Sequence, residues 1–222
     1  MKFKKSLNGF LRGPTLGAGA RLLFPTEVIG RELLPNEPYV LVVGPHKTYR
    51  ETVIVPAFLQ EHEFHIMAKD SLFRIPVFGW IFRNAGGIPV IRGGGRGGEA
   101  IAPATAELEN GYPVLIFPEA TRFDDVELHR AKDGAVKIAL QANVKIALAG
   151  IRGMRKNGLH SKRSIHLGLF DPQAELSSIL KTSTVVLSDK VAMRLVTEVM
   201  MERLATLADT TYNNKDERGN KA

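Results

Sequence analysis

Short apolar runs bounded by turn residues recur through the middle of this chain. The runs YVLVV at residues 39–43 and PVLIF at residues 113–117 are apolar without interruption, which is typical of strands buried on both faces of a sheet. Further apolar runs predict strands at residues 64–68, 88–91, 144–151 and 164–170.

Helical segments are expected between and after these strands. The longest covers residues 188–208, where apolar residues recur at helical spacing. Residues 72–82, LFRIPVFGWIF, are strongly apolar but contain Pro76 and Gly79, so we expect a broken helix there. Shorter helices are expected at residues 52–60, 99–109 and 132–142.

This alternation of strands and helices indicates an α/β domain with a mostly parallel central sheet flanked by helices. A chain of 222 residues favours one such domain, which we expect at residues 25–212. Residues 1–24 are expected to form a basic amphipathic segment, and residues 213–222 a polar, frayed tail.

Composition excludes several classes of protein. Apolar residues make up 44% and charged residues 24% of the chain, which excludes wholesale disorder. The absence of cysteine excludes disulfides, thiolate nucleophiles and cysteine-based zinc sites. The formal net charge of +7 suits nucleic acid, anionic lipid or phosphorylated substrates equally. Because only 7% of the residues are aromatic and no RNA-binding or helix-turn-helix signature is present, we expect no nucleic-acid partner.

The chain contains no apolar run of the ~18 residues that cross a bilayer, and its basic N-terminus lacks the apolar core of a secretory signal. We therefore expect a peripheral protein at the cytoplasmic face of a membrane. The candidates for contact with anionic lipid are the aromatic-rich residues 72–82 and the N-terminal segment, which carries Phe3, Leu7, Phe10 and Leu11 among lysines. Packing of these segments on the domain is the alternative.

The segment PHKTYRE, residues 45–51, follows the first apolar strand and holds His46 and Glu51 five positions apart. On one continuous helix this spacing separates two side chains by about 140°. The side chains meet only if His46 lies in the turn before a helix and Glu51 in its first turn. A carboxylate that accepts a hydrogen bond from one imidazole N–H fixes the tautomer and stabilises the imidazolium, which leaves the other nitrogen as a general base. A surface or helix-capping histidine is the alternative.

The segment FPEATR, residues 117–122, comes at the end of the PVLIF strand. A carboxylate at Glu119 is able to hold a polyol hydroxyl, and a guanidinium at Arg122 is able to bind phosphate through two parallel hydrogen bonds. A salt bridge within the loop is the alternative.

A glycine-rich stretch, GGIPVIRGGGRGG, covers residues 86–98. Its backbone amides and the side chains of Arg92 and Arg96 suit a phosphate group. The stretch is neither a P-loop nor a dinucleotide-binding fingerprint, so we do not expect it to bind a nucleotide. A merely flexible loop is the alternative.

Four candidate residues share one position relative to the predicted strands. His46, Lys69, Arg92 and Glu119 each follow a strand. Sites in parallel sheets collect at the carboxyl ends of the strands, so we expect these four residues to gather at one edge of the sheet.

Together, PHKTYRE, GGIPVIR and FPEATR occur in the order and at the spacing of the glycerolipid acyltransferase family. The chain resembles its lysophosphatidic acid (1-acyl-sn-glycerol-3-phosphate) acyltransferase branch. The linking residues 67–92 and AKDGAVKIAL at residues 131–140 also look like this family. The resemblance covers residues 27–152.

The resemblance implies a membrane-surface enzyme that moves an acyl group from acyl-CoA or acyl carrier protein to the hydroxyl of lysophosphatidic acid, giving phosphatidic acid. It implies no further cofactor, no metal and no obligate protein partner. His46 would deprotonate the acceptor hydroxyl as a general base, and Glu51 would orient His46. Four residues would bind the acceptor: Lys69, Arg92, Glu119 and Arg122.

Two positions depart from the family pattern. The family has Asp where Glu51 stands, and Glu is one methylene longer. It usually has Gly where Ala120 stands, and Ala costs on the order of 1 kcal/mol relative to Gly if the backbone there is left-handed. These departures leave open another acceptor, such as a different lysophospholipid or a glycolipid. A non-catalytic protein that binds anionic lipid is the remaining alternative.

Overall fold

A seven-stranded sheet forms the centre of the molecule. The computed structural model describes residues 16–48, 50–59, 63–84, 86–91, 96–123, 125, 127–153, 162–183 and 186–215. The strands of this sheet are β1 (Thr26–Ile29), β2 (Val40–Gly44), β3 (His65–Lys69), β4 (Ile88–Val90), β5 (Val114–Ile116), β7 (Ile146–Arg152) and β8 (Arg163–Phe170). They lie in the order β1-β8-β7-β2-β5-β3-β4, and every neighbouring pair is parallel except β7 and β8.

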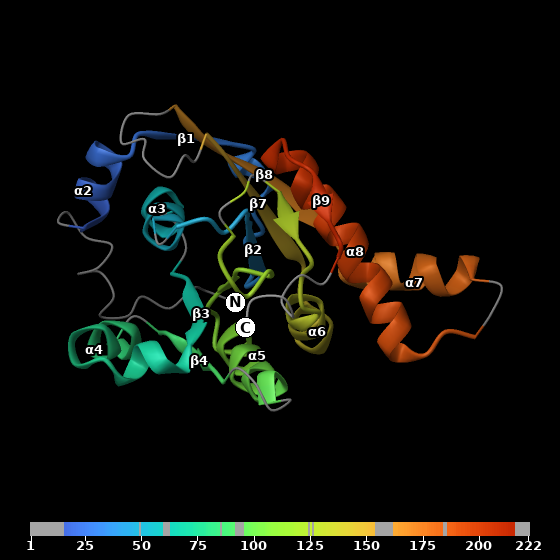
Figure 1. Cartoon of the computed structure of the whole chain (residues 1–222). Coiled ribbons are helices and arrows are strands. Elements are labelled where there is room, and N and C mark those ends of the chain that lie inside the picture. The colour runs from blue at the N-terminus through green and yellow to red at the C-terminus, as the bar shows by residue number, and fades with distance from the viewer. Residues whose placement is uncertain are drawn as a thin grey trace.

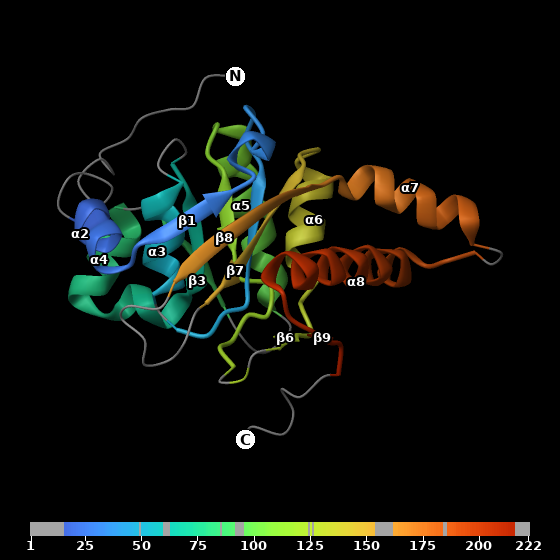
Figure 2. The same cartoon turned by 90° about the horizontal axis from the view of Figure 1, so that it is seen from above.

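Helices cover both faces of this sheet, as Figure 1 shows. One face carries α3 (Glu51–Phe58), against which α2 (Leu16–Leu23) packs. The other face carries α5 (Ile101–Glu109), α6 (Gly134–Gln141) and α8 (Asp189–Ala208). The helix α7 (Pro172–Thr182) packs on α8, and Figure 2 shows this pair projecting beyond the sheet. The remaining elements are α4 (Pro76–Asn84), the 3-10 helices η1 (Arg31–Leu33), η2 (Asp70–Arg74) and η3 (Arg96–Ala100), and the paired strands β6 (Leu128–His129) and β9 (Tyr212–Asn213).

The strand β2 separates two hydrophobic clusters. Val40 and Val42 point into the cluster that includes α5, α6 and α8, whereas Leu41 and Val43 point into the cluster that includes α3. All four side chains are fully buried. Residues on successive positions of a strand face opposite sides, so a strand covered on both faces needs an uninterrupted apolar run. This confirms the α/β fold and the mostly parallel sheet expected from the sequence.

The apolar stretch at residues 72–82 is broken, as predicted. The 3-10 helix η2 ends at Arg74, and α4 begins at Pro76. Proline has no N–H group, so it is favoured at the first position of a helix and disfavoured inside one. Within the described part of the chain, no helix has both the length and the apolar character that a bilayer crossing requires.

Several elements were not expected from the sequence. These are β1, α7 and the small β6–β9 pair. The pairing of β9 also changes the boundary of the expected polar tail, because Asn213 aligns with His129 and its side chain donates to Glu127 Oε2 at 3.3 Å. Asn213 therefore belongs to the folded domain. The amphipathic segment expected at residues 1–24 lies outside the described residues except for residues 16–24, most of which form α2.

Candidate active site

His46 lies two residues after β2, in the turn that leads to α3. The end of β2 is closely packed: a Cβ at Gly44 would approach the methyl groups of Leu128 to 2.6 Å and of Leu204 to 2.9 Å. The backbone carbonyl of His46 accepts from the Phe123 N–H at 3.3 Å. The turn is therefore held from both sides, by the core beneath it and by the segment that follows β5.

The His46 and Glu51 side chains face each other. His46 Nδ1 lies 3.6 Å from Glu51 Oε2, and the Glu51 side chain is fully buried. This geometry requires His46 before the helix and Glu51 at its first position, which is how the sequence placed them. The separation is longer than a hydrogen bond, and such contacts often tighten only when substrate is bound.

Glu51 has a second partner, Thr48. The Glu51 carboxylate accepts from the Thr48 backbone N–H at 2.8 Å and from the Thr48 hydroxyl at 3.1 Å. The Thr48 hydroxyl in turn accepts from the Arg50 N–H at 3.0 Å. These hydrogen bonds satisfy the backbone N–H groups of Thr48 and Arg50 in the turn before α3. Thr48 thus fixes the orientation of the carboxylate that faces His46.

Glu119 lies on the other side of His46. The His46 backbone N–H donates to Glu119 Oε1 at 3.1 Å, and the Glu119 side chain is fully buried. Burial raises the pKa of the Glu119 carboxyl to about 8, because a charged carboxylate is costly away from water. The backbone N–H groups of His46 and His129 oppose that rise.

The FPEATR segment forms the turn after β5. Its Phe117 ring stacks on the His46 imidazole, with ring centroids 4.0 Å apart. Ala120 has a φ of 58°, so position 120 does require the left-handed conformation. Alanine there costs on the order of 1 kcal/mol relative to glycine. Arg122 is half-buried at the end of this turn.

Charged residues that the sequence did not single out complete the site. Burial lowers the pKa of the Lys47 ammonium, while the carboxylates of Asp125, Glu51 and Glu119 oppose that shift. His129 Nε2 lies 2.8 Å from Asp125, and its ring stacks on Phe123.

Lys69 and Arg92 are the remaining residues that the sequence predicted for this site. Lys69 is exposed at the end of β3. Arg92 lies outside the described residues, as does Tyr49 of the PHKTYRE segment. In the part of the chain that the structure describes, no group of three or more His, Asp or Glu side chains is arranged to hold a metal ion.

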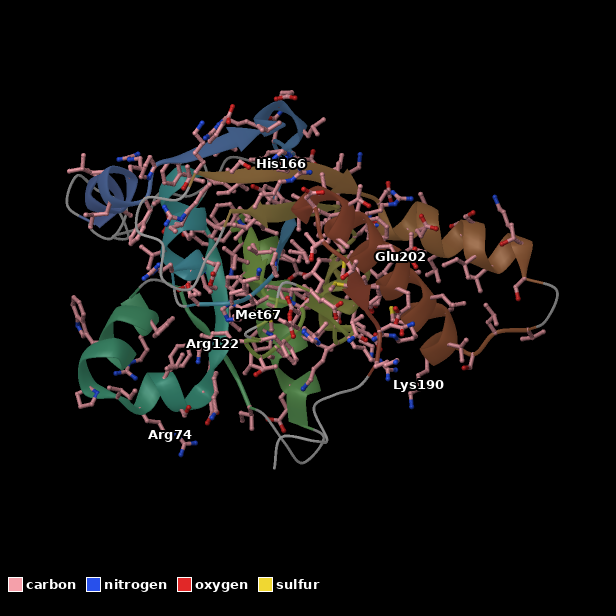
Figure 3. All side chains as sticks on the ribbon, turned by 45° about the horizontal axis from the view of Figure 1, so that its top comes forward. Met67, Arg74, Arg122, His166, Lys190 and Glu202 are labelled. Atoms are coloured by element: carbon pink, nitrogen blue, oxygen red, sulfur yellow. The ribbon has the colours of Figure 1, made fainter. Side chains whose placement is uncertain are left out.

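A pocket of about 410 Å³ lies beside the FPEATR turn, and we call it the apolar pocket. Figure 3 labels Met67 of this pocket and Arg122 of the turn, both near the centre of the molecule. The volume is within the range of small-molecule sites. Its apolar walls come from the ends of β3, β4 and β5 and from α5 and α6, and include Met67, Ala68, Val90, Ile91, Ile101, Ile116, Phe117 and Ala135. Its polar rim includes Lys132, Asp133 and Lys137.

A second His–Glu pair lies at the opposite end of the sheet. His65 Nδ1 is 2.9 Å from Glu107 Oε2, which is closer than the separation between His46 and Glu51. His65 is the first residue of β3 and pairs with Val114, the first residue of β5. The amino ends of parallel strands are not where sites collect, and the His65 ring is stacked on Tyr112. Distance alone therefore does not distinguish the two pairs. Of the two histidines, His46 is the one at the carboxyl edge of the sheet.

Comparisons of the sequence with known proteins point to one family. A family model described as Acyltransferase matches residues 25–151, more than half of the chain. A 1-acyl-sn-glycerol-3-phosphate acyltransferase from Streptococcus pneumoniae is 29% identical over 185 residues, which cover 82% of this chain and 67% of that protein. A protein with the same activity in its name, from Chlamydomonas reinhardtii, is 29% identical over 167 residues, or 72% of this chain. The match covers 49% of the Chlamydomonas protein, so this chain spans about half its length.

The fold also matches a solved structure. The crystal structure of the 1-acyl-sn-glycerophosphate acyltransferase from Thermotoga maritima superposes with a TM-score of 0.62 at 21% identity. The alignment covers 89% of this chain and 78% of the Thermotoga chain. At this identity the likeness supports the fold, an α/β domain with a mostly parallel sheet.

Proposed function

This chain belongs to the acyltransferase family, and we propose that it acts at a membrane surface to transfer an acyl group from a thioester to the hydroxyl of lysophosphatidic acid. One observation carries the proposal. His46, which faces Glu51, meets the FPEATR turn and a substrate-sized apolar pocket at the carboxyl edge of the sheet. A base, a polar anchor and an apolar pocket are what acylation of a lysophospholipid requires.

In the proposed reaction His46 is the general base. Its Nδ1 faces Glu51, which leaves Nε2 to take the proton from the acceptor hydroxyl. The hydroxyl oxygen then forms a bond to the thioester carbonyl carbon. The carbon–sulfur bond breaks, and the departing thiolate takes the proton from His46. Glu51 stabilises the imidazolium that exists between the two proton transfers.

The apolar pocket suits the acyl chain of the donor. Phe117 belongs to the pocket wall and also stacks on His46, so a chain in the pocket would end beside the base. Ala68 and Ala135 contribute small side chains to the pocket wall. Burial of each CH₂ group of the acyl chain would stabilise the complex by about 0.8 kcal/mol.

We assign the acceptor to the polar residues of the FPEATR turn. Arg122 suits the acceptor phosphate, because guanidinium groups bind phosphate through paired hydrogen bonds. Glu119 belongs to the same turn as Arg122, accepts from the His46 backbone N–H, and suits a glycerol hydroxyl. We also assign Arg92 and Lys69 to the phosphate, on the resemblance alone.

Thiol release tests the activity directly. The chain has no cysteine, so a thiol reagent reports only the thiol that leaves the donor. We expect release from palmitoyl-CoA or palmitoyl acyl carrier protein to depend on lysophosphatidic acid and to yield phosphatidic acid. Equal release with and without acceptor would indicate only thioester hydrolysis, and no release with any donor would contradict the proposed activity.

Arg122→Ala is expected to raise KM for lysophosphatidic acid roughly tenfold or more, because the substitution removes charge-assisted hydrogen bonds to the phosphate. The measurement compares kcat/KM for lysophosphatidic acid with that for monoacylglycerol, which lacks the phosphate. The variant should lose most of the preference for the phosphorylated acceptor. Arg203→Ala is the matched control, since Arg203 is bound to Glu175 on the α7–α8 pair. If Arg122→Ala and the parent prefer lysophosphatidic acid over monoacylglycerol to the same degree, other residues bind the acceptor phosphate.

We further propose that α2 and α4 face the membrane. Both helices lie at the same end of the molecule in Figures 1 and 2. Trp80 on α4 is 61% exposed and Leu22 on α2 is 84% exposed, with Arg74 and Arg83 exposed beside Trp80 in the sequence. Apolar insertion combined with basic residues holds peripheral proteins at anionic interfaces, each basic residue contributing about 1 kcal/mol.

Vesicle sedimentation tests this surface. We expect the protein to pellet with anionic vesicles, to be released by high salt, and to pellet several-fold less after removal of residues 1–12 or after Trp80→Ser. Val186→Ser is the control, because Val186 is fully exposed in the segment between α7 and α8. This helix pair lies opposite α2 and α4 in Figure 2. Unchanged pelleting of the Trp80 variant would remove α4 from the membrane contact, and unchanged pelleting of the truncated chain would remove the N-terminal segment.

A further inference from the structure

A second, larger concavity adjoins the apolar pocket. It has a volume of about 550 Å³ and lies between residues 130–133 and the first two turns of α8. Four of its lining residues are basic: Arg130, Lys132, Lys190 and Arg194. We call it the basic pocket. Asp133 is the one acid among the described lining residues. None of the roles proposed above uses this pocket.

The walls of the basic pocket are held together by Arg194. Its guanidinium donates to the Ala131 carbonyl at 2.6 Å and to Asp133 Oδ1 at 3.1 Å, which ties α8 to the segment before α6. It also binds Glu198 and the Tyr212 hydroxyl. The lining of the pocket contains more basic than acidic side chains.

The two pockets share part of their lining, and both lie next to the segments that contact His46. Lys132 and Asp133 line both pockets. The Lys132 backbone N–H donates to the Pro118 carbonyl of the FPEATR turn at 3.0 Å. Phe117, the preceding residue, lines the apolar pocket and stacks on His46. These contacts connect the basic pocket to His46 through Lys132, Pro118 and Phe117.

The lining combines charge with exposed apolar surface. Val191 and Leu195, one helical turn apart on α8, are both exposed in the pocket wall beside Lys190. In Figure 3 Lys190 lies on α8, away from Met67 of the apolar pocket. Such a lining suits a phosphate group joined to a less polar chain.

We propose that the basic pocket binds the phosphate of the pantetheine arm that carries the donor's acyl group. This inference rests on the proposed function. In both acyl-CoA and acyl carrier protein, the thioester stands at the end of a long phosphopantetheine arm, so the phosphate must bind well away from the reacting carbon. The acceptor differs in this respect. In lysophosphatidic acid only the glycerol unit separates the phosphate from the reacting hydroxyl, so its phosphate must bind close to His46, as assigned to Arg122.

A donor series tests the pocket. The donors are palmitoyl-CoA, palmitoyl acyl carrier protein and S-palmitoyl-pantetheine, which lacks the phosphate. We expect Lys190→Glu to raise KM for the phosphate-bearing donor roughly tenfold and to leave KM for lysophosphatidic acid unchanged. The preference of the enzyme for that donor over S-palmitoyl-pantetheine, expressed as a ratio of kcat/KM, should fall by the same factor. Lys190→Arg keeps the charge and should retain the preference of the parent.

The matched control is Lys181→Glu, which reverses an exposed charge at the end of α7, outside the pocket. An effect of equal size in this control would indicate only long-range electrostatics and would overturn the proposal. So would an unchanged donor preference in Lys190→Glu, or a raised KM for the acceptor instead of the donor. Failure of the parent with all three donors would instead refute the proposed function. In that case calorimetric binding of free CoA to the parent and to Lys190→Glu still decides whether the pocket binds such a phosphate.

Discussion

His46→Ala is expected to lower the rate of acyl transfer at least about 100-fold, the usual contribution of a general base. The histidine lies after β2 at the carboxyl edge, between the buried carboxylates of Glu51 and Glu119. Alanine removes the only imidazole in the PHKTYRE turn but keeps the backbone N–H that donates to Glu119. The fold should therefore survive. The measurement is thiol release under saturating donor and acceptor, together with thermal unfolding of both proteins.

His166→Ala is the matched control for this loss. His166 lies on β8, where its Nε2 is 3.0 Å from the Ser164 hydroxyl, and it is no part of the cluster around Glu119. This variant should keep near-parent turnover. Near-parent thiol release by the His46 variant would exclude His46 from the mechanism, whatever its place in the fold.

The sequence predicted those strands of the fold that are buried on both faces. The strands β2 and β5 are buried throughout, so their sequences are apolar throughout. The helix α7 was not predicted, because it packs mainly on α8 and buries only Pro172. Its sequence therefore shows little apolar periodicity. A usable signal was present, since Asp171 caps the helix and Pro172 follows at its first position.

Two other elements carry almost no local signal. The edge strand β1 has four residues, and the β6–β9 pair joins segments 84 positions apart through two residues each. The hydrogen bonds that define such pairs depend on how the chain folds back on itself. Sequence periodicity within a short window does not contain this information.

The site was predictable in its local part. His46, Thr48 and Glu51 are brought together by one turn and the start of one helix, so their spacing was informative. The hydrogen bond from His46 to Glu119 joins residues 73 positions apart and exists because β2 and β5 are neighbours in the sheet. The two pockets depend on the ends of several strands and on α6 and α8 together. No single segment of the sequence contains that arrangement.

Glu119→Gln is expected to make the protein's stability less dependent on pH between about 5 and about 8. Burial raises the pKa of the Glu119 carboxyl to about 8, whereas in the unfolded chain it titrates near 4.5. Between these values the folded state holds a proton that the unfolded state has lost. The free energy of unfolding then falls as pH rises, by roughly 1.4 kcal/mol per pH unit for one proton, a few kcal/mol in all.

The measurement is urea unfolding of the parent and of Glu119→Gln from pH 5 to pH 9, with Glu109→Gln as a control at an exposed carboxylate. Glutamine keeps an oxygen that accepts from the His46 N–H, so the substitution removes the titration with little change of shape. The stability difference between this variant and the parent should grow in the variant's favour up to about pH 8 and then stay constant. Parallel curves would mean that Glu119 is already ionised in the folded protein. Glu119 would then meet an acceptor hydroxyl only as a hydrogen-bond acceptor, whereas the protonated carboxyl is also able to donate.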